Sequence, residues 1–301
     1  MVSGLSFWIG PARERAAIER DRADRSAAIA RRHERLLITD PASMRALHQR
    51  MAAVHRRGEE RHLTAAKLHE AHIRRLTRWF SADDLDEERP RLISAVAELT
   101  GARSAGLTLL DSWRTEASVT GSDEIALAAQ DLELTLGEGP MHDSTSTGRP
   151  VVATGEALWC RWQHYSPAIA ALGVHALAVV PLGPPDRCVG ALTVLDPPRP
   201  ELPGPLTGEL EELADALTHT MLLTAETVAG LAPEASGTAD VLDSPNQRLV
   251  LHQAVGMVAA QNDCSVDDAS SLIRAWAFAH EEQVTEVARR IVAKRLRLDT
   301  R

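Results

Sequence analysis

Glycine is almost absent from the 70 residues that follow position 10, and this absence narrows what the N-terminal part can fold into. Residues 11–37 and 41–80 are rich in Ala, Arg, Glu, Leu and His, and only Gly58 interrupts them. That composition is typical of long exposed helices. Between the two segments, Asp40 can cap a helix and Pro41 can occupy its first position. The pattern predicts a helical arm over residues 1–80.

The second segment carries an a/d heptad pattern of apolar residues, which is the signature of a coiled coil. Gly58 and Arg61 interrupt the pattern. We therefore expect a short, imperfect coiled coil that either pairs two chains or folds back on itself, and we expect a homodimer. The residues on the a/d frame are Met44, Leu47, Met51, Val54, Ala65 and Leu68.

A ladder of four histidines, His48, His55, His62 and His69, repeats every seven residues beside this seam. Successive members lie about 10.5 Å apart along a helix, so no two of them can share one metal ion within a chain. We interpret them as solvated residues flanking the seam. The alternative is a proton-sensitive dimer contact, because histidine titrates near neutral pH.

The middle of the chain changes to β-rich runs between two helices, which predicts an α/β domain with an antiparallel sheet over residues 81–227. One strand is expected at Ala105–Leu110. Two more, at residues 175–182 and 188–195, should form a hairpin with an irregular loop. The flanking helices are indicated by two helical stripes, Ile93, Val96, Ala97 and Leu210, Leu213, Ala214, Leu217, Met221.

A linker rich in Gly, Pro, Ser, Ala and Thr is expected at residues 228–244, followed by a three-helix bundle at residues 245–301. Ser244-Pro245-Asn246-Gln247 and Ser265–Asp268 are helix starts of the capping type. Three apolar stripes support the helices: Leu251, Ala254, Val255, Val258; Val266, Ala269, Ile273, Trp276; and Val284, Val287, Ala288, Ile291, Val292. The whole chain is thus predicted to be α+β.

The C-terminal unit resembles the ANTAR domain, an RNA-binding output module of bacterial antiterminators, over about residues 246–297. The likeness rests on Gln253-Ala254-x-Gly256-Met257, Asp268-Ala269, Leu272-x-Arg274, Ala277 and Val287-Ala288-x-x-Ile291-Val292. In this family the position of Val255 is commonly Lys. Glu281 and Glu282 replace polar or basic residues, and two carboxylates there would repel a phosphate backbone.

The middle unit is similar to the GAF domains that precede ANTAR in actinobacterial proteins. The likeness is carried by Leu136-Gly137-Glu138-Gly139-Pro140, Thr147-Gly148-Arg149-Pro150-Val151, Val180-Pro181-Leu182 and Gly190–Leu195. Together the two resemblances imply a signal-responsive transcription antitermination regulator in which GAF senses and ANTAR binds RNA hairpins. The alternative is a protein-interaction regulator whose bundle is degenerate and binds no RNA.

RNA binding would need basic groups on one face and a polar side chain that reads a base. The candidates are Arg248, Gln253, Arg274, Arg289, Arg290 and Lys294. Basic residues near the end of the last helix could instead only complement its dipole.

An aromatic cluster in the middle domain offers two interpretations. Trp159, Trp162 and Tyr165 could form the lid of a small-molecule effector site, or pack as core under a long loop, which we prefer. His142 lies at an expected helix start where backbone N–H groups could receive an anion. Ordinary capping is the simpler explanation there.

Charge and motif content exclude several classes of function. Residues 80–242 hold 8 basic and 25 acidic residues, so this segment would repel nucleic acid. We find no P-loop, dinucleotide-binding pattern, zincin pair or nucleophile elbow, and the three cysteines have no paired spacing. We expect no enzyme activity, no cofactor and no metal. No apolar run approaches a membrane span, and we expect a cytoplasmic protein.

Overall fold

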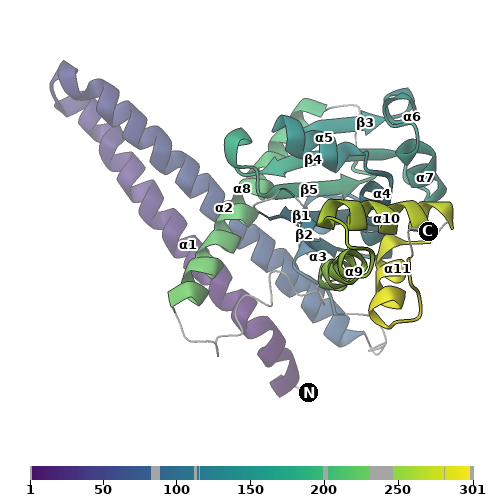
Figure 1. The fold of residues 1–301 in the computed structure, drawn as a ribbon. Helices are drawn as coiled ribbons and strands as arrows, with labels where there is room; N and C mark the ends of the chain where they lie inside the picture. The colour runs from purple at the N-terminus through teal and green to yellow at the C-terminus, as the bar shows by residue number, and fades with distance from the viewer. Residues whose placement is uncertain are drawn as a thin grey trace.

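The computed structural model describes residues 2–82, 89–111, 114, 116–198, 203–230, 247–280 and 282–298. A long helical hairpin, here called the arm, projects from a middle domain built on one sheet, and three C-terminal helices lie beside that domain (Figure 1). Most of the predicted linker, residues 231–244, lies outside the described residues. Its first three positions, 228–230, belong to the end of helix α8.

The arm consists of α1 (Val2–Thr39) and α2 (Arg45–Ser81), joined through the 3-10 helix η1 (Ala42–Met44). The chain therefore folds back on itself (Figure 1). The buried face of α1 is mainly alanine, and Ala16, Ala23, Ala27 and Ala30 are at most 4% exposed. Small side chains at the contact allow two helices to approach closely.

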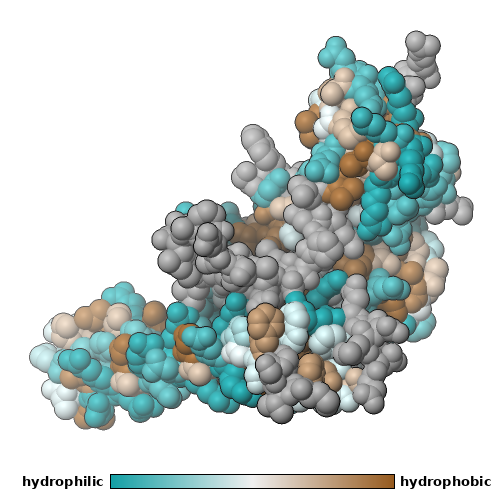
Figure 2. Space-filling view, turned by 90° about the horizontal axis from the view of Figure 1, so that it is seen from below, coloured by the Kyte–Doolittle hydropathy of each residue, from teal (hydrophilic) through white to brown (hydrophobic). Residues whose placement is uncertain are grey.

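The predicted heptad frame is wrong for the first half of α2. Met44, Leu47 and Val54 are 38%, 39% and 61% exposed, whereas Ala65 and Leu68 are fully buried. Figure 2 shows the resulting surface of the projecting arm, at the left, as mainly hydrophilic with separate hydrophobic residues. The contact surface of α2 differs from the predicted a/d positions because the alanine face of α1 packs against the side of α2 that carries the histidines.

The interpretation of the histidine ladder as solvated is also wrong for three of its four members, whereas His55 is partly exposed. His48, His62 and His69 are at most 8% exposed, because each lies between the two helices. His62 Nδ1 lies 2.6 Å from Glu19 Oε2, and His48 Nε2 lies 2.9 Å from Asp40 Oδ2. Asp40 thus contacts a histidine, and η1 begins without a side-chain capping bond.

The middle domain contains a five-stranded antiparallel sheet in the order β2-β1-β5-β4-β3. The predicted hairpin is present, with Leu177 opposite Leu195 and Leu182 opposite Gly190 across η2 (Pro185–Arg187). Strands β2 and β3 were not predicted. The strands are β1 (Ser104–Leu110), β2 (Glu116–Gly121), β3 (Val151–Thr154), β4 (Ala176–Leu182) and β5 (Gly190–Leu195).

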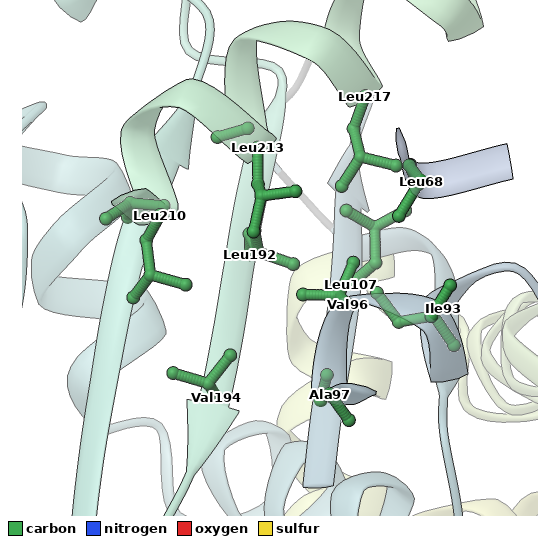
Figure 3. Packing of buried hydrophobic residues seen from close by; sticks show 14 of the residues in the cluster. Leu68, Ile93, Val96, Ala97, Leu107, Leu192, Val194, Leu210, Leu213 and Leu217 are labelled. Atoms are coloured by element: carbon green, nitrogen blue, oxygen red, sulfur yellow. The ribbon is translucent and has the colours of Figure 1, made fainter. Parts of the chain in front are cut away.

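Helices cover both faces of this sheet, and residues along β4 alternate between two cores because successive side chains point to opposite faces. On one face lie α3 (Ile93–Thr100), α8 (Pro203–Gly230) and the base of α2. Leu68 of the arm packs among the leucines of this core (Figure 3). On the other face lie α4 (Glu124–Leu136), α5 (Pro140–Thr147), α6 (Glu156–Arg161) and α7 (Tyr165–Ala171).

The C-terminal helices α9 (Gln247–Asn262), α10 (Val266–Ala279) and α11 (Val284–Val292) share one hydrophobic core, and we call them the bundle. The predicted capping start at Ser265 is confirmed, since its Oγ accepts a hydrogen bond from Asp268 N at 3.1 Å. Leu134 of α4 packs against the bundle core, so the bundle rests on the middle domain. Figure 1 shows the bundle beside α4 and β2.

Candidate functional site

A buried carboxylate, Glu133, lies inside the middle domain at the start of α5. Its Oε2 accepts hydrogen bonds from Met141 N at 2.8 Å and His142 N at 3.2 Å. Glu133 is 5% exposed, and this desolvation raises its pKa well above the usual value, with Glu116 and Asp143 adding to the rise. The backbone N–H groups that we considered for an anion at this helix start are therefore occupied by a carboxyl group of the protein itself, and the side chain of His142 is exposed.

Gly139 is required by this arrangement. A Cβ at this position would lie 2.4 Å from Glu133 Cγ and Oε2, and the residue has a φ of +154°. The neighbouring Glu138 has a different task, because its Oε1 accepts hydrogen bonds from His164 N at 2.6 Å and Tyr165 N at 3.0 Å. These bonds lower the pKa of Glu138. The Gly-Glu-Gly-Pro segment thus joins α4, α5 and α7.

Two members of the predicted aromatic cluster, Trp162 and Tyr165, pack into the core, as preferred from the sequence. Tyr165 is fully buried and Trp162 is 3% exposed, with their rings 5.9 Å apart and nearly perpendicular. Trp162 Nε1 donates to Asp143 Oδ2 at 3.2 Å. The buried hydroxyl of Tyr165 has no hydrogen-bond partner, and desolvation, with a contribution from Glu133, raises its pKa. The side chain of Trp159 lies outside the described residues.

Helix α4 also forms the docking surface of the bundle. Thr285 Oγ1 donates a hydrogen bond to Asp131 Oδ2 at 2.9 Å, and both residues are buried. His252 Nε2 lies 3.2 Å from the carbonyl oxygen of Glu116, and the rings of His164 and Phe278 are 6.4 Å apart. Polar and aromatic contacts therefore supplement the packing of Leu134.

The predicted RNA-binding residues whose side chains the structure describes differ in exposure and in their contacts. Gln253, Arg289 and Lys294 are exposed, although Arg289 NH1 donates to Glu286 Oε2 at 3.1 Å. Arg274 donates to Ser271 Oγ at 3.3 Å, and a Cβ at Gly137 of the middle domain would lie 3.7 Å from its NH1. The side chains of Arg248 and Glu281 lie outside the described residues.

Arg290 is engaged within the bundle. Its NH1 donates to both carboxylate oxygens of Glu282, at 2.8 and 2.6 Å, and its guanidinium lies 5.1 Å from the ring centre of Trp276. Glu282, which we expected to repel a phosphate backbone, thus balances this cation. The pair explains why the acidic residue is tolerated beside the basic helix.

A cleft of about 1000 Å³ lies where the arm, α4 and the bundle meet, and sequence reasoning did not find it. Its lining includes the docking pair Asp131 and Thr285 together with Arg75 and Arg289. The residues come from positions 75 to 289 and include both basic and acidic side chains, so no local sequence pattern marks the cleft.

The middle domain is thus a small α/β domain with helices on both faces of its sheet. Residues 84–222 match the GAF domain family, so the chain contains a GAF domain. One similar solved structure is described as a domain of a two-component sensor histidine kinase from Sinorhizobium meliloti 1021. It is 19% identical, with a TM-score of 0.33, and the match covers 46% of this chain and 92% of that one.

No curated protein matches the chain. Among the helices that the structure describes, none has the length and apolar character needed to span a membrane.

Proposed function

We propose that this protein is a signal-responsive regulator, without enzymatic activity, in which the GAF domain senses and the bundle is the output module. The observation that carries this proposal is the position of α4 between the two. Glu133 faces the GAF interior and Asp131 contacts the bundle. Residues two positions apart on a helix point about 200° apart, so one rigid helix serves both sides.

The small-molecule effector is expected in the cleft beside α4, where a ligand would touch Asp131 and Thr285 directly. A ligand can shift the docking equilibrium only by as much as its affinity differs between the docked and released states. Thermal-shift measurements with small metabolites on the wild type and on Arg75→Ala would test the location. Equal stabilisation of both proteins would argue against the cleft.

RNA hairpins are the proposed target of the bundle, and antitermination the proposed outcome. Support comes from the ANTAR resemblance and from the exposure of Gln253, Arg289 and Lys294. An amide can read a base edge, and cations can contact phosphates. A homodimer would bring two bundles to one RNA, and tethering would strengthen two modest contacts.

A titration of hairpin RNA at several salt concentrations tests this proposal. The double variant Arg289→Ala, Lys294→Ala should bind all hairpins more weakly, with the salt slope lowered by about 0.7 to 0.9 for each lost phosphate contact. Gln253→Ala should lose discrimination between loop sequences and keep the slope. Arg187→Ala, an exposed arginine of the GAF domain, is the matched control.

The second candidate is a protein-interaction regulator whose bundle does not bind RNA. The pairing of Arg290 with Glu282 and the position of Arg274 beside Gly137 favour it, because the charge of Arg290 is already balanced and both side chains are partly buried. Absence of hairpin binding by the wild type, and also by a variant with a released bundle, would support this function over the first.

A further inference from the structure

A cluster of one carboxylate and two imidazoles joins the arm to the GAF domain. Glu19 belongs to α1, His62 to α2 and His219 to α8, and their potential ligand atoms all lie within 4.8 Å of one another. Glu19 and His62 are 5% and 8% exposed, and the rings of His62 and His219 are 5.0 Å apart. Three helices distant in sequence therefore bring these side chains to one place.

The contacts within the cluster leave one group unsatisfied. His62 Nδ1 lies 2.6 Å from Glu19 Oε2, and the other oxygen of Glu19 accepts a hydrogen bond from Arg22 NH1 at 2.6 Å. The buried Nε2 of His219 has no hydrogen-bond partner. Leaving a buried polar atom unpaired costs free energy, so a ligand that binds this nitrogen would be stabilising.

We propose that Glu19, His62 and His219 bind a divalent transition-metal ion, with Zn²⁺ the best match. Two imidazoles and one carboxylate are a ligand set that zinc accepts, usually with water in a fourth position. Two imidazole ligands make Mg²⁺ and Ca²⁺ poor candidates for this site, because both ions prefer oxygen ligands.

The distances fit such an ion after small side-chain movements. Ligand atoms at ordinary zinc distances on a tetrahedral ion are separated by about 3.3 Å. Glu19 and His62 must separate slightly from 2.6 Å, while the widest separation, at most 4.8 Å, must shrink. Two arginines lie nearby, and each is paired with a carboxylate: Arg22 with Glu19 at 2.6 Å and Arg61 with Asp215 at 3.8 Å.

Metal binding would fix the arm to α8. Since the ion binds ligands from three helices that separate on unfolding, it stabilises the folded state, by an amount that grows with the logarithm of its free concentration divided by its dissociation constant. The stability of the contact between the arm and the GAF domain would thus depend on the metal concentration. This property is separate from RNA binding by the bundle.

Zinc titration of the full chain against a chromophoric competing chelator tests the site. The proteins compared are the wild type, His219→Gln and, as a matched control, His175→Gln, which changes an exposed histidine outside the cluster. Circular dichroism verifies folding. Thermal melts with and without Zn²⁺, and the visible absorption of bound Co²⁺, give two further readouts.

The expected result is one Zn²⁺ per chain in the wild type and in His175→Gln, with at least tenfold weaker binding in His219→Gln. Zn²⁺ should raise the melting temperature of the wild type and of His175→Gln but not of His219→Gln. Co²⁺ should give the strong visible bands of a four-coordinate site. No binding by the wild type, or a loss of less than tenfold in His219→Gln, overturns the proposal. Neither result depends on whether the bundle binds RNA.

Discussion

Glu133 links α4 to the start of α5 through two hydrogen bonds, and this requires burial of an ionisable group. Its burial raises its pKa, so the carboxyl is neutral over a pH range in which an exposed glutamate is charged. A group whose pKa is raised by folding contributes stability at pH values below its pKa in the unfolded chain. This contribution is lost as pH rises through its pKa in the folded protein.

We therefore predict that Glu133→Gln removes a loss of stability at high pH. Glutamine has the same shape, and its amide oxygen can accept the bonds from Met141 N and His142 N. Urea unfolding of both proteins at pH 5, 7 and 8.5 measures the difference between their free energies of unfolding. This difference should move in favour of the variant as pH rises. A difference that is constant with pH would show that Glu133 is charged in the folded protein.

Residue-level prediction from the sequence succeeded where composition was unusual and failed where it was ordinary. Trp162 and Tyr165 were noticed because aromatic residues are scarce in this chain. Glu133 was missed because an acidic residue in a helix rich in acidic residues carries no signal. The signal that could have revealed it is Gly139, whose missing side chain makes room for the carboxylate.

At the level of elements, the arm was predictable as helices but not as a packed pair. The helical composition of residues 11–80 is local information, whereas the frame of the seam depends on the partner helix. The alanine face of α1 packs against the side of α2 that carries the histidines, and this packing is a tertiary contact that the sequence of α2 alone does not reveal. Strand β3 has only four residues, and β2 has six but only two apolar ones, Ala117 and Val119, so neither strand gave a recognisable pattern.

The buried histidines of the arm predict a loss of stability in mild acid. Burial lowers the pKa of His69 and of His72 to about 4, with Arg15 adding to the effect on His69, and His69 to that on His72. The unfolded chain, with a pKa near 6.5, binds more protons between these values. Stability is thus full above about pH 6.5 and falls toward pH 4, by at most about 3 kcal/mol for each histidine.

Urea unfolding at pH 7, 6 and 5 checks this expectation. His69→Gln and His72→Gln should each flatten the dependence on pH, because glutamine does not titrate. His175→Gln, which alters an exposed residue, should retain the wild-type slope. Identical slopes in all four proteins would mean that neither buried imidazole stays neutral in the folded arm.

For the whole molecule, the base of the arm cannot be separated from the GAF domain, because Leu68 and Ala71 belong to its core. Self-association through the arm must be tested by substitution. Ile38 and Val54 are 86% and 61% exposed, and we predict that Ile38→Glu with Val54→Glu lowers the mass measured by light scattering from dimer to monomer. A wild type that is already monomeric at micromolar concentration would exclude the dimer.

The docking of the bundle on α4 leads to the prediction that concerns the whole molecule most directly. Thr285 is 3% exposed and donates a hydrogen bond to the buried carboxylate of Asp131. Thr285→Val keeps the shape and removes the donor, which should cost about 1 to 3 kcal/mol of docking free energy. Population of the released bundle should then rise about fivefold to more than a hundredfold.

Small-angle scattering and limited proteolysis measure this release, and Thr285→Ser is the control because it keeps the hydroxyl. We expect Thr285→Val to have a larger radius of gyration and faster cleavage before α9, while Thr285→Ser behaves as the wild type. If docking restrains the output, hairpin affinity should rise in Thr285→Val in parallel with the released fraction. An increase in release without any change in affinity would show that α4 holds the bundle in place but does not control what it binds.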